Sequence, residues 1–212
     1  AVANVNDDPT GSVVISGTVT EDQVLSITNT LADEDVLGSF SYVWNRAGTA
    51  ISGATSATYT LTQSDVGSAI TVTVSYTDGQ GTAESSTSAA TAAVANVNDD
   101  PTGSVVISGT ATEDQVLSIT NTLADEDVLG SFSYVWNRIT GGTSAAISGA
   151  TSATYTLTQS DVASTITVTV SYTDGQSTAE SSTSAATAAV ANVNDDPTGS
   201  VVISGTATED QV

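Results

Sequence analysis

Carboxylates are the chemical groups that this sequence supplies in number. The chain has 24 Asp and Glu residues against two basic residues, Arg46 and Arg138, and it contains no His, Cys, Lys or Met. Oxygen ligands of this kind select hard cations such as Ca²⁺, whereas zinc and copper sites need His or Cys. The net charge of −22 also repels phosphates and anionic lipids, so we expect no nucleic-acid partner and no membrane insertion.

Catalytic chemistry is hard to build from the same residues. A hydrolase needs an activated nucleophile next to a base, and the chain offers no His, Cys or Lys for that purpose. No glycine-rich phosphate loop follows a strand and opens a helix. Paired carboxylates can cleave glycosides, but that reaction needs a cleft, and these acids lie in turn-forming segments. We therefore expect no enzymatic activity and no catalytic residues.

The acids recur because the whole sequence recurs. The segment VANVNDDPTGSVVISGT begins at Val2, Val94 and Val190, and nearly everything between the copies is repeated as well. Arrays of domain-sized units usually act through length and spacing instead of through one reactive pocket. We predict one domain over residues 1–97, a second over 98–193, and the first strand of an incomplete third repeat over 194–212. Because the chain starts and stops inside a repeat, we expect it to be a fragment.

The two complete copies differ in length at one place. Residues 47–50 read AGTA, whereas residues 139–146 read ITGGTSAA. An insertion that leaves both flanks unchanged is expected in an exposed hairpin loop, because a strand could not absorb it without losing register.

Each copy predicts about seven short antiparallel strands. Residues 69–78 alternate Ile, Val, Val and Tyr with Thr and Ser, which is the period of two of a half-buried strand. Similar alternation predicts strands at 11–17, 23–31, 40–45, 57–62 and 82–97, with Gly, Asp and Asn at the breaks. The pattern predicts an all-β fold of tandem β-sandwiches with Trp44 and Trp136 in the cores. The apolar stretches are too short for a transmembrane helix.

The order of these features resembles an immunoglobulin-like domain. Trp44 stands in the place of the central Trp on strand C, and TYTLTQSDVGSAITVTVSY resembles the E strand, the E–F corner and the F strand. The chain lacks the Cys pair, and Ile70 takes the first inward position of the F strand instead of the corner Tyr. Both departures make it more similar to bacterial immunoglobulin-like and cadherin-like repeats than to antibody domains.

In this topology the acids collect at the two ends of each sandwich. The A–B turn and the E–F corner lie at one end, and the B–C and F–G loops lie at the other, beside the incoming linker. Like charges several ångströms apart cost on the order of a kcal/mol per pair where water is partly excluded, so a cation should neutralise them. Ca²⁺, which takes roughly six to eight oxygen ligands, is the expected cofactor. Nine carboxylates would crowd the first junction: Glu21, Asp22, Asp65, Asp99, Asp100, Asp125, Glu126, Asp127 and Asp174.

The NVNDDP segment resembles the calcium-binding linker of cadherins, in which an Asn-Asp pair precedes a Pro. The resemblance implies that Asn98, Asp99 and Asp100 are linker ligands, with Asn96 where cadherins have an Asp. It implies further ligands in the repeats on either side: Glu21, Asp65, Asp125 and Asp127, which we extend to the neighbouring acids Asp22 and Asp174.

Repetition of the motif predicts two more half-sites. The upper half-site at the chain start would contain Asp7, Asp8, Asp33, Asp35 and Asp78. The lower half-site near the chain end would contain Glu113, Asp114, Asp161, Asn194, Asp195 and Asp196.

Simpler roles for these residues stay open. Acidic loops are often solvated faces that keep a protein soluble. Asp65 could instead cap the E–F corner, because an Asp in a turn can accept hydrogen bonds from its own backbone. The Thr stripes of the strands suit an exposed sheet face, and a flat ice-binding or polysaccharide-binding array is disfavoured because sandwich sheets twist.

The complete repeat, with LADEDVLGSFSYVWNR, ISGATSATYTLTQSDVGSAITVTVSYTDG and AAVANVNDDPTG, resembles the extender repeats of giant bacterial RTX-type surface adhesins. The resemblance implies a monomeric spacer on the extracellular surface of a Gram-negative bacterium, exported by a type I system and folded where calcium is abundant. It would contact neighbouring repeats of its own chain and project a distal binding domain, as in biofilm adhesion. The alternative is a glycan-binding or self-associating module, and exposed edge strands could also pair laterally between chains.

Overall fold

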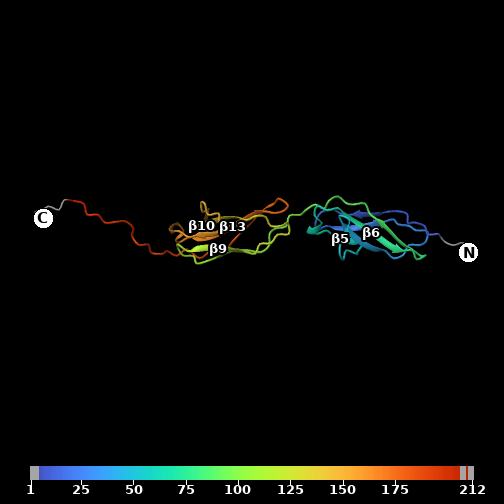
Figure 1. The fold of residues 1–212 in the computed structure, drawn as a ribbon, viewed down its shortest axis with the longest axis horizontal. Coiled ribbons are helices and arrows are strands. Elements are labelled where there is room, and N and C mark those ends of the chain that lie inside the picture. Colours follow the sequence, from blue (N-terminus) through green and yellow to red (C-terminus); the bar gives the residue numbers. More distant parts are fainter. Residues whose placement is uncertain (1–4, 206–208, 210–212) are drawn as a thin grey trace. The chain divides into compact units, whose positions relative to one another are not determined.

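The backbone of the computed structural model, which describes residues 5–205 and 209, consists of strands, turns and two short 3₁₀ helices. The chain divides into two compact units, which we call unit 1 and unit 2 (Figure 1). Unit 1 comprises Ala1–Pro101, Ala124–Gly130 and Thr173–Ala179. Unit 2 comprises Thr102–Leu123, Ser131–Tyr172 and Glu180–Val212.

Seven strands of unit 1 form two antiparallel sheets. The first sheet has the order β1-β2-β5, built from Val13–Ser16, Val24–Asn29 and Thr58–Thr60. The second has the order β4-β3-β6-β7, built from Thr49–Ala50, Ser41–Arg46, Ile70–Thr77 and Ala83–Thr87. The A, B and E strands thus lie in one sheet and the C, F and G strands in the other, as in immunoglobulin-like sandwiches. This strand order confirms the predicted all-β fold.

The second repeat has the same arrangement. Its first sheet has the order β12-β9-β8, from Thr154–Thr156, Val116–Asn121 and Val105–Ser108. Its second sheet has the order β11-β10-β13-β14, from Thr143–Ala146, Ser133–Thr140, Thr165–Thr173 and Ala179–Thr183. Strands β1 and β8 share the sequence VVIS and pair with β2 and β9 in the same register.

The core lies between the two sheets of each sandwich. Strand β6 buries Ile70, Val72 and Val74 completely, as the alternation predicts. Trp44 is fully buried against them and donates its indole N–H to the Ser56 carbonyl at 2.9 Å. Its ring stacks on Tyr59 with centroids 5.6 Å apart. Both tryptophans are core residues, as expected, because Trp136 is equally buried.

The insertion in the second repeat corrects one expectation. It lies in an exposed hairpin, but its residues extend the strands instead of the loop. Ile139 pairs with Ser144 and Thr140 pairs with Thr143, so each strand gains two residues relative to the β3–β4 hairpin. Adding an equal, even number of residues to both strands keeps every side chain on its original face, so the register survives.

The last strand of the first repeat is shorter than predicted. β7 ends at Thr87, and the chain beyond it forms isolated parallel bridges from Val94 to Val66 and from Ala95 to Thr20. These bridges tie the NVNDDP segment to the end of the sandwich that carries the A–B turn and the E–F corner.

The start of the third repeat differs from the complete repeats. Residues 194–205 form no strand, and Val201, Val202 and Ile203 are 98%, 77% and 96% exposed. The predicted strand over 194–212 includes residues 206–208 and 210–212, which lie outside the described residues.

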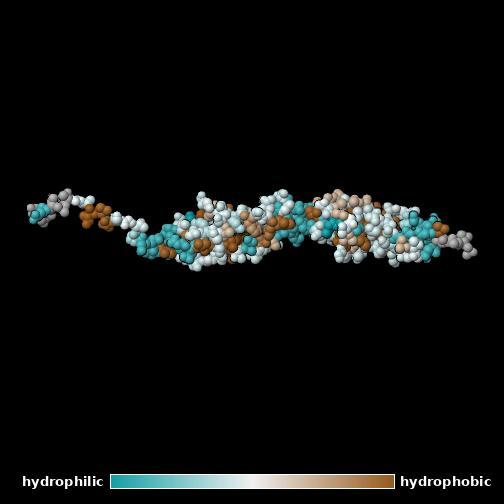
Figure 2. All heavy atoms as spheres, viewed as in Figure 1, coloured by the Kyte–Doolittle hydropathy of each residue, from teal (hydrophilic) through white to brown (hydrophobic). Residues whose placement is uncertain are grey.

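Most of the surface of the two units has intermediate hydropathy, the colour of Ser, Thr and Gly in Figure 2. Within the described part of the chain, no helix has the length and apolar character needed to cross a membrane.

Candidate metal centre

The NVNDDP segment is held along the A–B turn of unit 1. Glu21 donates its backbone N–H to the Ala95 carbonyl at 2.9 Å, and Val97 donates its N–H to Oε2 of Glu21 at 3.3 Å. Just before this segment, Val94 is buried and bridges Val66. The acids that follow Val97 are therefore anchored close to Glu21.

Three carboxylates of unit 1 are close enough to bind one cation. Ligand oxygens of Glu21, Asp99 and Glu126 all lie within 4.8 Å of one another, and no other such group occurs in residues 5–205 and 209. The three residues come from the A–B turn, the NVNDDP segment and the segment Ala124–Gly130 of the same unit. We call these three residues the acid cluster, and such a cluster could hold a metal ion.

Asp127 lies beside the acid cluster and is fully buried. Its Oδ2 accepts the Asp99 backbone N–H at 3.0 Å, and its Oδ1 accepts the side-chain amide of Gln63 at 2.9 Å. Both donors are neutral, and the two arginines of the chain form ion pairs with other acids. A buried carboxylate without a basic partner is costly, so this position favours a cation.

Besides Oε1 of Gln63, two buried oxygens in this part of unit 1 have no hydrogen-bond donor among the described residues. Asp174, which is 6% exposed, accepts the N–H groups of Gln176 and Thr178 on Oδ1 at 2.8 and 2.7 Å, and its Oδ2 is left without a partner. Oδ1 of Asn96 is also buried without a partner. Buried acceptors are normally satisfied, so open oxygens beside a group of acids are suited to metal ligation.

Two acids of the centre, Glu21 and Asp99, have raised pKa values. Burial raises the pKa of Glu21, and the charges of Asp99, Asp22 and Asp127 raise it further, against the opposing hydrogen bond from Val97. Burial followed by the charges of Asp127, Asp22, Asp125 and Asp100 raises the pKa of Asp99. A divalent cation would relieve this repulsion, and carboxylate and amide oxygens are the ligands that hard cations prefer.

The other predicted residues of this centre lie around the cluster. Asp125 accepts the backbone N–H of Asp127 on Oδ1 at 2.9 Å and so shapes the turn that presents Asp127. Asp22 is exposed with a positive φ of 62°. Asn98 and Asp100 are exposed residues of the NVNDDP segment.

Asp65 has the capping role that was the alternative to ligation. It is fully buried, and Arg46 donates Nε to its Oδ1 at 2.7 Å. Its Oδ2 accepts the Tyr59 hydroxyl at 2.8 Å and both the backbone N–H and the hydroxyl of Thr62 at 2.9 and 3.0 Å. Burial would raise the pKa of Asp65, but these hydrogen bonds, with that from Arg46 the strongest, hold the pKa below its ordinary value. The bonds close the 3₁₀ turn η1, Gln63–Asp65.

Asp161 is bound in the same way in unit 2. Arg138, Tyr155 and Thr158 donate to its carboxylate, and they close the 3₁₀ turn η2, Gln159–Asp161. Neither Asp65 nor Asp161 has an oxygen free of these bonds, so neither resembles the open acids around Asp127.

The acids predicted for the upper half-site lie in unit 1 without forming a second close group of three carboxylates among the described residues. Asp35 accepts the Asp7 backbone N–H at 3.1 Å, and Asp33 accepts the Tyr76 hydroxyl at 2.6 Å. Asp78 is 6% exposed and has one buried oxygen without a partner among the described residues, as Asp174 does. Asp8 is exposed.

The acids predicted for the lower half-site are mostly exposed in unit 2. Glu113 is buried and accepts the Val193 N–H at 3.2 Å, matching Glu21 and Val97. Asp114 is exposed with a φ of 64°. Three predicted residues of the last NVNDDP copy are also exposed: Asn194, Asp195 and Asp196.

Two residues of the centre were not assigned from the sequence. Glu126 is one of the crowded acids of the sequence, but the cadherin pattern selects its neighbours Asp125 and Asp127 as ligands. Gln63 carries no charge, so its residue type gives no reason to expect it at a metal site. Its position three residues before Val66, which bridges the segment leading to Asn96, is the signal that could have found it.

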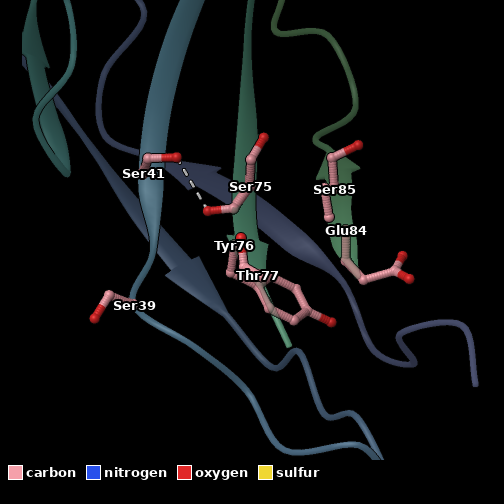
Figure 3. A pocket seen from close by; sticks show the side chains of 8 residues that line it. Ser39, Ser41, Ser75, Tyr76, Thr77, Glu84 and Ser85 are labelled. Carbon is pink, nitrogen blue, oxygen red and sulfur yellow. Dashed lines mark hydrogen bonds between the residues drawn. The ribbon is translucent and has the colours of Figure 1, made fainter. Parts of the chain in front are cut away.

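A shallow hollow in unit 1 is a separate polar feature. It encloses about 410 Å³ on the β3–β6–β7 face and is lined by Ser41, Ser75, Ser85 and Glu84 (Figure 3). Ser41 donates to the Ser75 carbonyl at 3.1 Å, and Glu84 accepts the Asn6 amide at 2.9 Å. Tyr76, which also lines the hollow, is 4% exposed, so the hollow presents small hydroxyl groups instead of an aromatic platform.

Comparison with known proteins gives structural matches only. No protein-family model and no curated protein sequence matches the chain. It is similar to three N-terminal domains of the highly immunogenic outer capsid protein of bacteriophage RB49, with 17% identity, a TM-score of 0.30, and coverage of 82% of this chain and 59% of that one. It is also similar to a tetra-tandem repeat in the extending region of a large adhesion protein, with 20% identity, a TM-score of 0.29, and coverage of 85% of this chain and 50% of that one. A third match is to domains from titin, with 14% identity, a TM-score of 0.31, and coverage of 86% of this chain and 60% of that one. The chain therefore spans between half and three fifths of the solved chains, and the fold assignment rests on its own strand order.

Proposed function

We propose that this chain is a spacer segment of a secreted bacterial surface adhesin, in which calcium bound at the acid cluster stiffens the connection between successive repeats. The observation that carries the proposal is the group of buried acids around Asp127, whose charge no basic residue offsets. Its repetition in sequence with each NVNDDP copy supports a structural role for the site.

Calcium fits the available ligands better than other common metals. The acid cluster, Asp127 and Asp174 supply carboxylates, and Asn96 adds a neutral amide oxygen. Ca²⁺ accepts about six to eight such oxygens in a flexible shell, whereas Mg²⁺ requires a strict octahedron and gives up water reluctantly. These residues come from four separate segments of the chain, so flexible geometry is an advantage.

The proposed action of the ion is electrostatic and mechanical. Without the ion, repulsion among the acids favours separation of the A–B turn, the NVNDDP segment and the segment 124–130. With the ion, ligands from all three share one shell. Binding that occurs only in the assembled geometry stabilises that geometry by mass action.

The cellular setting follows from the sequence resemblance to extender repeats of bacterial adhesins. On this basis we propose that the chain lies outside a Gram-negative cell, where millimolar calcium would keep such a site filled. We propose that the chain is monomeric and that its partners at this site are its own neighbouring repeats.

Small-angle X-ray scattering tests the proposal. In millimolar calcium we expect a longer and less flexible particle than in EDTA, and magnesium at the same concentration should have a weaker effect. Identical scattering in calcium and EDTA would contradict the stiffening role. Calorimetric titration of the same sample then reports whether calcium binds at all.

A further inference from the structure

The E–F corner of unit 1 connects a buried ion pair to the proposed metal site. Gln63 is the first residue of η1 and Asp65 is the last. The Asp65 carboxylate accepts hydrogen bonds from the backbone N–H and the hydroxyl of Thr62, the residue just before Gln63. The carboxylate of Asp65 therefore fixes the backbone from which the Gln63 side chain extends.

The side chain of Gln63 extends from the E–F corner to Asp127. Its Nε2 donates to Oδ1 of Asp127 at 2.9 Å, whereas its Oε1 is buried and accepts no hydrogen bond from the described residues. The amide of Gln63 thus has a hydrogen-bonded nitrogen and an oxygen without a partner, next to a fully buried carboxylate. A rotation of the amide group can exchange the positions of these two atoms. Rotation of the amide would direct a neutral oxygen to the place where a cation meets Asp127.

The second repeat has a related contact at the same corner, to a different acid. Asp161 closes η2 with the same set of bonds, and the side-chain amide of Gln159 lies 2.9 and 3.2 Å from the carboxylate oxygens of Glu113 when its nitrogen faces that acid. In both repeats the corner thus places a Gln amide against a buried acid. The acid differs, because Glu113 is the counterpart of Glu21 and not of Asp127. What recurs is a corner Gln whose amide reaches an acid at that end of the sandwich.

We infer that Gln63 is a ligand of the cation and that Asp65, held by Arg46 and Tyr59, is the positioning residue that delivers it. The inference rests on the proposed function, because it requires that the site bind calcium. Residue type alone would make Asp65 the ligand. In this assignment the charged Asp65 does not touch the cation, whereas the neutral Gln63 does.

Calcium titration of the whole chain by calorimetry, paired with thermal unfolding in EDTA, tests this assignment. Gln63→Ala should weaken the tightest calcium site by about tenfold, in the range seen when a metal site loses one supporting group. Its unfolding temperature in EDTA should stay close to that of the wild type. The matched control Gln159→Ala, at the same corner of unit 2, should leave this site at wild-type affinity.

The positioning role has its own readout. Tyr59→Phe removes one hydrogen bond from Asp65 and keeps the ring that stacks on Trp44. It should lower calcium affinity in the wild-type background and have no further effect when Gln63→Ala is already present. Asp65→Asn should behave similarly if the variant folds.

Three results would decide against the inference. Wild-type affinity in Gln63→Ala would remove the ligand role while leaving the proposed function intact. Equal losses from Tyr59→Phe with and without Gln63 would show that Asp65 acts on the site by another route. A wild-type chain that binds no calcium would overturn the proposed function together with this inference.

Discussion

Two valines in the B–C loops adopt a backbone conformation that β-branched residues avoid. Val36 and Val128 have φ values of 74° and 72°, and their side chains are 68% and 66% exposed. The loop that contains Val128 is fixed by the N–H of Gly175, which donates to the carbonyls of Asp127 and Val128 at 2.8 and 3.0 Å. Strain of this kind costs roughly 1–3 kcal/mol and collects near functional groups.

Replacing such a valine should therefore stabilise the protein. Val36→Asn is expected to raise the free energy of unfolding by about 1 kcal/mol, because Asn tolerates positive φ and little burial is lost. Chemical denaturation in EDTA measures the change. The control Val14→Asn alters an exposed valine in β1, where no strain exists, and should give no gain. Equal effects of the two substitutions would contradict the strain argument.

The acid cluster can be probed at its exposed member. Glu126→Gln keeps the shape of the side chain and removes one charge, so calcium should bind about tenfold more weakly or worse, while stability in EDTA should be unchanged or slightly higher. Glu34 occupies the same place in the first repeat, outside the acid cluster. Glu34→Gln should therefore leave the tight site intact. A comparable loss in both variants would argue for a general charge effect.

At the scale of elements, the β10–β11 hairpin shows how the fold accepts length variation. Deleting Ile139, Thr140, Thr143 and Ser144 together removes two cross-strand pairs and keeps the Gly141–Gly142 turn. The remaining register matches that of β3–β4, so the free energy of unfolding should change by less than about 0.5 kcal/mol. Deleting Thr140 alone should destabilise the sandwich, because a one-residue shift turns the side chains of a strand to the wrong face. Urea denaturation of both variants distinguishes these outcomes.

The sequence predicts which side chains of a strand are buried, but it does not predict the contacts made at the E–F corners. Alternation fixes which side chains of β6 are buried, since Ile70, Val72 and Val74 have only one face on which to lie. The role of Asp65 depends on whether Arg46, 19 residues away in sequence, reaches it. The sequence could offer only a ligand or a cap as alternatives. The place of Gln63 is hard to predict for a related reason: a neutral residue joins an acidic site only through the geometry of its turn.

At the scale of the molecule, stability without metal should depend on pH in two opposite ways. Glu21 and Asp99 have raised pKa values, so the folded chain binds more protons than the unfolded one, and stability should increase as the pH falls from neutral toward their ordinary values near 4.5 and 3.8. Asp65 and Asp161 have lowered pKa values, so their contribution is complete above the ordinary value of 3.8 and is lost as the pH falls below it.

Denaturation in EDTA over a pH series should therefore show a maximum in mildly acidic solution. Saturating calcium should raise stability most at neutral pH, where protons do not compete for the ligands. A steady loss of stability from pH 7 downward in EDTA would show that the crowded acids are not under repulsion.

The identity of β1 and β8 in sequence and register has a consequence for biosynthesis. A newly made VVIS strand finds two equivalent places, one beside β2 and one beside β9, and no side chain tells them apart. Tandem proteins with interchangeable strands tend to exchange them between neighbours while folding. Production of a long array of such units thus favours completion of each sandwich before the next emerges, in the order of synthesis or export.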